Sequence, residues 1–271
     1  MKKYYTRACN FYYGNTSKNL IKRGLSLPLC GNKNISFDKV EITVKDKRKI
    51  SSKIVNLKEI TKLPIKRRNK IYIDIKNITS QRKHFNQTKI MGILNMTPDS
   101  FSDGGKYNQT SAASSKIVSM INSGADIIDI GGESTRPGSK IISQKDEWNR
   151  IAAIVKKFKK KHPKISLSID TRKSEIMSKS IKLKADIIND VSCYSFDLNS
   201  LNAVKNANAW KVIHHMQGTP QTMQKNPKYK NALLDIYDFF EVEIERLKST
   251  KYFNKIILDV GIGFGKNLKH N

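Results

Sequence analysis

The feature that most constrains this chain is an alternation of two kinds of segment that begins at residue 89. Short apolar runs rich in Ile end in polar or glycine-rich loops, and segments with helical periodicity separate these runs. Such alternation is typical of a parallel sheet whose strands are joined by right-handed crossover helices. The predicted strands are 89–94, 127–130, 165–169, 187–189, 210–214 and 256–259, and the predicted helices are 110–123, 146–161, 174–184, 199–206 and 231–250.

The length of the repeat narrows the choice of fold. One strand and one helix together take about 33 residues, which fits the units of a (β/α)₈ TIM barrel. A doubly wound open sheet is the alternative with the same alternation. We therefore predict an α/β fold in which residues 89–271 supply about six βα units of a TIM-type barrel. In such a barrel the chemistry lies on the loops that follow the strands.

Residues 1–88 carry weaker signals. Residues 36–44 and 70–78 alternate as short strands do, and residues 57–63 resemble a helical turn that ends at Pro64. The basic run at residues 66–70 is interpreted as a solvated linker rather than a localisation signal or an anion-binding patch. We expect residues 1–88 to form a basic N-terminal extension or a small appendage.

The net charge of +28 raises the question of a nucleic-acid partner. Residues 1–89 hold 23 Lys and Arg against 5 Asp and Glu, and residues 90–271 hold 28 against 18. However, 41 of the basic residues are Lys and only 10 are Arg, and Asn and Ile are also abundant. All three favoured residues have A/T-rich codons, so a nucleotide bias accounts for much of the charge. We expect no nucleic-acid partner.

Several other classes of protein are excluded by composition. No apolar stretch approaches the roughly 18–20 residues that a membrane span needs. The first thirty residues also lack the apolar core of a secretory signal. The three cysteines (Cys9, Cys30 and Cys193) are odd in number and show no CxxC spacing, which excludes a disulfide framework or a zinc ribbon. We therefore expect a cytoplasmic protein with no membrane partner.

Polar side chains follow the apolar strands at the same end of the predicted sheet. They are Asn95, Asp129, Asp170, Asn189, His214, His215 and Asp259. Any one of them is weak evidence, but together they indicate a site. Asp and Asn side chains can match the alternating donors and acceptors on the edge of a flat nitrogen heterocycle. For the two histidines, a buried and hydrogen-bonded role is favoured over metal ligation.

Two long segments resemble the signature loops of the dihydropteroate synthase family. They read MGILNMTPDSFSDGG at residues 91–105 and DIGGESTRPGS at residues 129–139. Four shorter motifs follow in the family's order: SIDT at 168–171, INDV at 188–191, HMQGTP at 215–220 and DVGIGFGK at 259–266. The resemblance covers about residues 89–271. It implies a TIM barrel that joins 6-hydroxymethyl-7,8-dihydropterin diphosphate to 4-aminobenzoate in folate synthesis.

The resemblance also implies roles for individual residues. Asn95 would contact Mg²⁺ together with the substrate diphosphate, and Asn95, Asp99 and Arg136 would be the catalytic residues. The pterin would be held by Asp170, Asn189, Met216 and Asp259. The loops around aminobenzoate and diphosphate would contribute Asp99, Phe101, Thr135, Arg136, Pro137, Gly263 and Phe264. The family reaction resembles an S_N1 displacement, and the full-length family form is expected to be a homodimer.

Two departures from the family pattern are visible. Val260 stands where the family has proline, and the sequence ends at Asn271, before the family's seventh and eighth strands. The Ser-Arg-Lys and Arg-x-His motifs that the family carries in that part are therefore not found after Asp259. Because six strands leave two edges unpaired, we expect the 271-residue chain by itself to be aggregated or molten and without synthase activity.

Two other functions remain open. One is a catalytically inactive, truncated pterin-binding remnant, which would retain the pterin residues without the chemistry. The other is a pterin-domain methyltransferase relative. The loops at residues 91–105 and 129–139 speak against the methyltransferase, because a methyl transfer has no diphosphate to cover.

Overall fold

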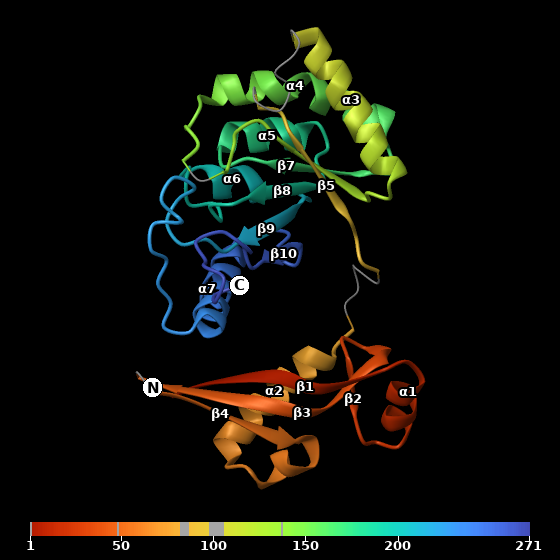
Figure 1. The fold of residues 1–271 in the computed structure, drawn as a ribbon, viewed down its shortest axis with the longest axis vertical. Coiled ribbons are helices and arrows are strands. Elements are labelled where there is room, and N and C mark those ends of the chain that lie inside the picture. Colours follow the sequence, from red (N-terminus) through yellow and green to blue (C-terminus); the bar gives the residue numbers. More distant parts are fainter. Residues whose placement is uncertain (1, 48, 82–86, 98–105, 137) are drawn as a thin grey trace. The chain divides into compact units, whose positions relative to one another are not determined.

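The chain folds as two compact units, Met1–Thr88 and Lys89–Asn271 (Figure 1). The structure is a computed structural model that describes residues 2–47, 49–81, 87–97, 106–136 and 138–271. Among the helices in these ranges, none has the length and apolar character that a membrane span requires.

The unit Met1–Thr88 is built on an antiparallel sheet in which β3 pairs with each of the other three strands. The strands are β1 (Lys3–Tyr13), β2 (Leu27–Leu29), β3 (Asn32–Asp46) and β4 (Lys49–Asn56). The helices are α1 (Gly14–Lys22), the 3₁₀ helix η1 (Leu57–Lys62) and α2 (Ile65–Thr79). The predicted strand at 36–44 and the helical turn at 57–63 are confirmed by β3 and η1.

Two predictions for this unit are wrong, and both concern α2. The segment 70–78 is helical rather than extended, and the basic run 66–70 forms the first turns of the same helix rather than a linker. Ile71 and Ile75 lie one helical turn apart and pack with sheet residues such as Val40 in a small core. The β-branched isoleucines suggested a strand, but their spacing of four residues puts them on one helix face.

The unit Lys89–Asn271 contains a parallel sheet of six strands in sequential order from β5 to β10. The strands are β5 (Met91–Asn95), β6 (Ile127–Gly131), β7 (Ser166–Asp170), β8 (Ile187–Asp190), β9 (Trp210–His214) and β10 (Ile256–Asp259). The helices are α3 (Lys106–Asn122), α4 (Gln144–Lys161), α5 (Ser174–Lys182), α6 (Ser200–Val204) and α7 (Ala232–Leu247). The predicted α/β fold, with six consecutive βα strands of a TIM-type barrel, is confirmed.

The two faces of this sheet bury different residues. Helices α3, α4 and α5 lie together on one side of the strands (Figure 1), and their apolar side chains form the main core with the outer strand residues. Ile127, Ile187 and Val212 form a smaller cluster from the alternate positions of their strands. Side chains alternate along a strand, so the residues two positions after these three lie on the same face of the sheet. They are Asp129, Asn189 and His214. We call this face the inner face.

Candidate active site at the strand ends

A row of inner-face residues crosses the carboxyl ends of β5 to β8. Asn95 pairs in register with Gly131, Gly131 with Asp170, and Asp170 with Asn189. Gly131 lets the neighbouring side chains of this row approach each other, since a Cβ there would lie only 3.3 Å from Asp170 Oδ2 and 3.6 Å from Asn95 Oδ1 and would crowd them. The sheet therefore brings the polar ends of Asn95, Asp170 and Asn189 to one surface.

The carboxylates of this surface lack the partners that buried acids usually have. Asp129 accepts a hydrogen bond from Asn189 Nδ2 at 3.0 Å through Oδ2, but its buried Oδ1 has no partner. Burial raises the pKa of Asp129. Burial, followed by the charge of Asp129, raises the pKa of Asp170 well above its ordinary value. Acids of this kind favour a ligand that donates hydrogen bonds.

Asp259 and His214 form a second pair on the inner face, at the ends of β10 and β9. His214 Nδ1 lies 3.0 Å from Asp259 Oδ2, and the Gly261 amide donates to Asp259 Oδ1 at 2.8 Å. The hydrogen bond from His214 lowers the pKa of Asp259. The Phe264 ring meets the His214 ring edge-on, with centroids 4.7 Å apart, and His214 Nε2 is buried without a partner.

The glycine-rich loop after β10 is held by a buried lysine. Lys266 Nζ donates to the carbonyls of Gly261 and Phe264, at 2.9 and 3.0 Å, and contacts His215 Nδ1 at 3.0 Å. Burial lowers the pKa of Lys266 to about 8. Burial and the Lys266 charge lower the pKa of His215 to about 4, so His215 is neutral. Gly263 has a φ of +80°, which favours glycine in this loop.

A cavity of about 410 Å³ adjoins the inner face beyond β7 to β9. Met216 and His214 line one side, and Arg172, Ser192 and Phe196 line another. The cavity therefore combines apolar walls with a buried cation, and it lies beside the residue expected to pack on the pterin.

The loop after β6 carries Thr135 and Arg136, and we call residues 133–136 and 138–142 the Arg136 loop. Glu133 Oε1 accepts a hydrogen bond from the Ile142 amide at 3.0 Å, which joins the two ends of the loop. Ser139 Oγ donates to the Ser134 carbonyl at 2.6 Å. Arg136 is exposed, so its guanidinium is open to an anionic ligand.

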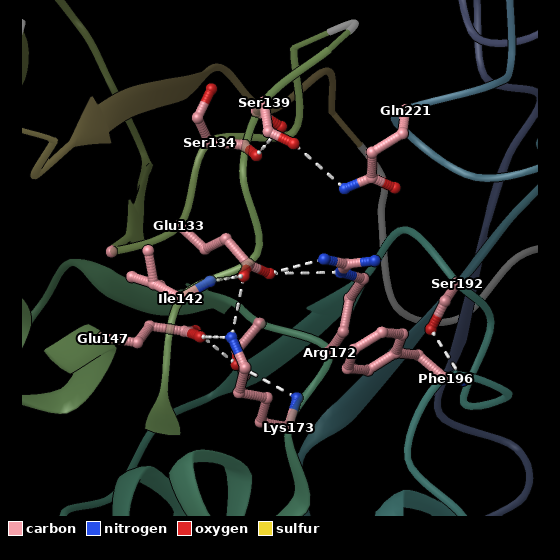
Figure 2. A network of polar contacts seen from close by, with 12 residues as sticks. Glu133, Ser134, Ser139, Ile142, Glu147, Arg172, Lys173, Ser192, Phe196 and Gln221 are labelled. Carbon is pink, nitrogen blue, oxygen red and sulfur yellow. Dashed lines mark hydrogen bonds and ion pairs between the residues drawn. The ribbon is translucent and has the colours of Figure 1, made fainter. Parts of the chain in front are cut away.

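Two cations from the β7 end bind Glu133 (Figure 2). Arg172 donates from Nη2 at 2.7 Å and from Nε at 3.3 Å to Oε2, and Lys173 donates at 2.9 Å to Oε1. Lys173 also pairs with Glu147, which accepts a further bond from Thr171 Oγ1 at 2.6 Å. Burial alone would raise the pKa of Glu133, but the bonds from Arg172 and Lys173 outweigh it and lower the pKa. For Glu147 burial prevails and the pKa is raised.

The predicted site residues fall into three groups. The structure brings Asn95, Asp170 and Asn189 into one row, and it places Asp259 and Phe264 around His214. Within the described ranges, no hydrogen bond or ion pair joins that row to Thr135 or Arg136. Asp99, Phe101 and Pro137 lie outside the described residues.

Three charged residues of this site were not predicted from the sequence: Glu133, Arg172 and Lys173. Their partners lie 39 and 40 residues apart in the chain, so only the fold brings them together. The one sequence feature that could have indicated them is their position, because these charged residues follow shortly after the apolar strands β6 and β7.

In the described part of the chain, no group of three or more His, Cys, Asp or Glu side chains could hold a metal ion. A metal ion held by one or two protein ligands, with its other positions taken by substrate oxygens or water, is compatible with this finding.

Comparison with known proteins gives the family. Residues 91–271 match the family model described as "Pterin binding enzyme". The Escherichia coli dihydropteroate synthase is 42% identical over 183 residues, which are 67% of this chain and 64% of the relative. The Clostridium beijerinckii dihydropteroate synthase is 41% identical over 194 residues, covering 70% of this chain and 69% of the relative.

A solved structure agrees with these matches. The Burkholderia cenocepacia dihydropteroate synthase, complexed with 7,8-dihydropteroate, superposes with a TM-score of 0.59 at 34% identity and covers 68% of this chain and 61% of its own. The chain spans about two thirds of the length of such relatives, 64% in the case of the Escherichia coli protein. By sequence and by fold, the chain belongs to the dihydropteroate synthase family of pterin-binding enzymes.

Proposed function

We propose that this chain provides the pterin site of a dihydropteroate synthase, which joins 6-hydroxymethyl-7,8-dihydropterin diphosphate to 4-aminobenzoate. The observation that carries this proposal is the group of under-bonded acids at the strand ends. Asp170 and Asp129 have raised pKa values, and Asp129 Oδ1 is buried without a partner. A pterin edge rich in N–H donors would satisfy such oxygens.

In this proposal the pterin ring lies across the inner face of the sheet. Asp170 and Asn189 bind its edge from β7 and β8, and Asp259 binds from β10, oriented by His214 and the Gly261 amide. Met216 packs against the ring from the loop after β9. A flat ring between these groups would replace water with matched hydrogen bonds.

The diphosphate and aminobenzoate belong, in the same proposal, to the loops after β5, β6 and β10. Arg136 and Thr135 bind the leaving diphosphate, and Gly263 and Phe264 flank the aminobenzoate. Asp99, Phe101 and Pro137 would complete these loops.

Magnesium would be held by Asn95. No described residue hydrogen-bonds the Asn95 side chain, and its Oδ1 lies 3.6 Å from the position that a Cβ on Gly131 would take. One amide oxygen fits a hard cation that takes its other ligands from diphosphate and water. When bound, the ion would neutralise negative charge on the leaving group.

The proposed reaction depends on two effects: stabilisation of the negative charge on the leaving diphosphate, and exclusion of water from the pterin methylene carbon. The bond between the pterin methylene carbon and the diphosphate oxygen breaks, and the electron pair leaves with diphosphate. Arg136 stabilises that charge. The aminobenzoate nitrogen forms the new bond to the methylene carbon and loses one proton. The walls formed by Phe264 and Met216 keep water from capturing the methylene cation.

Calorimetry with 6-hydroxymethyl-7,8-dihydropterin tests the proposed site in the 271-residue chain. We expect binding that is lost or weakened in Asp170→Ala. No binding by a chain that melts cooperatively would overturn the proposal. Turnover in the same preparation distinguishes the remaining alternatives: dihydropteroate formation supports the synthase directly, whereas binding without turnover indicates a pterin-binding remnant. The homodimer and the cytoplasmic location stay predictions.

A further inference from the structure

Arg172 joins the loops that follow three consecutive strands. It stands directly after β7, binds Glu133 of the loop after β6, and lies under Phe196 of the turn after β8. The guanidinium carbon is 4.2 Å from the centre of the Phe196 ring. The side chain is only 3% exposed, so its position is fixed by these contacts.

Arg172 is not needed merely to compensate the negative charge of Glu133. Lys173 already pairs with Glu133, and Glu147 has a raised pKa and can take up a proton. What Arg172 adds is a fixed position for Oε2, because two nitrogens of one rigid guanidinium donate to that oxygen; with Oε1 held by Lys173 and the Ile142 amide, the carboxylate plane is then set. Lys173, a point charge at the other oxygen, cannot do this.

The carboxylate plane of Glu133 in turn fixes the Arg136 loop. Glu133 Oε1 is the acceptor for the Ile142 amide, so a rotation of the carboxylate breaks the bond that closes the loop. Among the described residues, the far side of the loop is joined to the rest of the unit by Gln221 Nε2, which donates to the Ser139 carbonyl at 3.1 Å (Figure 2). The position of Arg136 therefore depends on the Glu133 contact.

We propose that Arg172 is a positioning residue that orients Glu133 and thereby holds Arg136 where it meets the substrate diphosphate. This inference rests on the proposed function for the identity of the ligand. The structural half of the proposal is that Arg172 fixes the Arg136 loop through Glu133, and this half does not depend on the proposed function.

Hydrogen exchange tests the structural half without any ligand. In Arg172→Met of the 271-residue chain, the segment that contains the Ile142 amide should exchange at least about tenfold faster, with Arg172→Lys in between. Arg246→Met is the matched control, because Arg246 also pairs with a glutamate, Glu243, and its other hydrogen bonds go to Cys193 rather than to the Arg136 loop. Unchanged exchange in Arg172→Met would overturn the proposal.

Calorimetry with two ligands tests the functional half. Arg172→Met should weaken binding of the pterin diphosphate about tenfold and leave binding of the free pterin alcohol unchanged, and Arg172→Lys should recover part of the loss. A general disturbance of the fold would weaken both ligands equally, and that result would overturn the proposal. If the unaltered chain binds neither ligand, the proposed function fails, and the exchange experiment alone decides the role of Arg172.

Discussion

Two groups of carboxylates differ in what surrounds them: Asp129 and Asp170 on β6 and β7, and Glu133 in the loop after β6. Glu133 accepts four hydrogen bonds, from the Ile142 amide, Lys173 and two nitrogens of Arg172. Asp170 accepts none from the residues that the structure describes, and Asp129 leaves one oxygen unpaired. The pKa of Glu133 is lowered, whereas the pKa values of Asp129 and Asp170 are raised.

This difference separates a scaffold from a binding site. A fully bonded acid stabilises the fold in which it lies, because its charge is compensated before any ligand arrives. An under-bonded acid costs stability until a ligand supplies the missing donors. We call Glu133, Glu147, Arg172 and Lys173 the Glu133 cluster, and Asp129 and Asp170 the strand-end acids. Removing a charge from the Glu133 cluster should therefore lower the free energy of unfolding, whereas neutralising a strand-end acid should raise it.

The largest effect is expected from Lys173→Met. This change removes the cation shared by Glu133 and Glu147 and leaves buried carboxylates with too few partners, so the free energy of unfolding should fall by about 3–5 kcal/mol at neutral pH. Denaturant unfolding of the 271-residue chain measures it if the chain unfolds cooperatively; a chain without a cooperative transition would instead bear out the molten state expected from its unpaired strand edges. Lys248→Met is the control, because Lys248 and Glu245 are exposed and should contribute less than about 1 kcal/mol. Equal losses in the two variants would contradict the scaffold role.

The next largest effect is a loss of stability in acid, which is expected because His215 is buried in the folded chain. Burial and Lys266 hold the pKa of His215 at about 4 in the folded chain, below its ordinary value of 6.5. The unfolded chain therefore binds the proton more tightly, and stability falls as the pH drops from 6.5 to 4, by about 3 kcal/mol in total. Unfolding curves across this range should be less pH-dependent in His215→Gln. A wild-type profile that matches His215→Gln would show that His215 is not held neutral.

A smaller and more selective effect is expected from Asn95→Ala. If Asn95 meets the metal and the diphosphate, its loss should weaken the diphosphate-bearing pterin by about 1–2 kcal/mol and leave the free pterin alcohol unaffected. Calorimetry with both ligands in the presence of Mg²⁺ measures the difference. Equal losses for the two ligands would place Asn95 in pterin recognition or in folding instead.

The residues at the strand ends could be predicted from the sequence because each buried parallel strand is recognisable from its own residues alone. Each strand of the Lys89–Asn271 unit is a short apolar run, and the polar residue that ends it points to the site. Asn95, Asp170 and Asn189 were found in this way, and the register of β5 to β8 brings them together.

The Glu133 cluster could not be predicted in the same way. Its bonds join residues 39, 40 and 26 positions apart, and nothing in the local pattern of Arg172 or Lys173 distinguishes a buried pair from an exposed one. The same limit applies to α2, where β-branched isoleucines are compatible with a strand until their partners in the core are known. β1 was missed because its aromatic residues stand in two runs, Tyr4–Tyr5 and Phe11–Tyr13, rather than in alternation, and of these residues only Tyr5 is buried.

Asp170→Asn tests most directly whether the strand-end acids are a binding site rather than part of the scaffold. Because the folded chain raises the pKa of Asp170, its charged form costs stability at neutral pH, and the neutral amide should raise the free energy of unfolding by on the order of 1 kcal/mol. The same change should weaken pterin binding by about 1–3 kcal/mol, because an acceptor becomes a donor. We predict a chain that is more stable and binds pterin less well. A chain that is less stable and binds pterin as before would contradict the assignment.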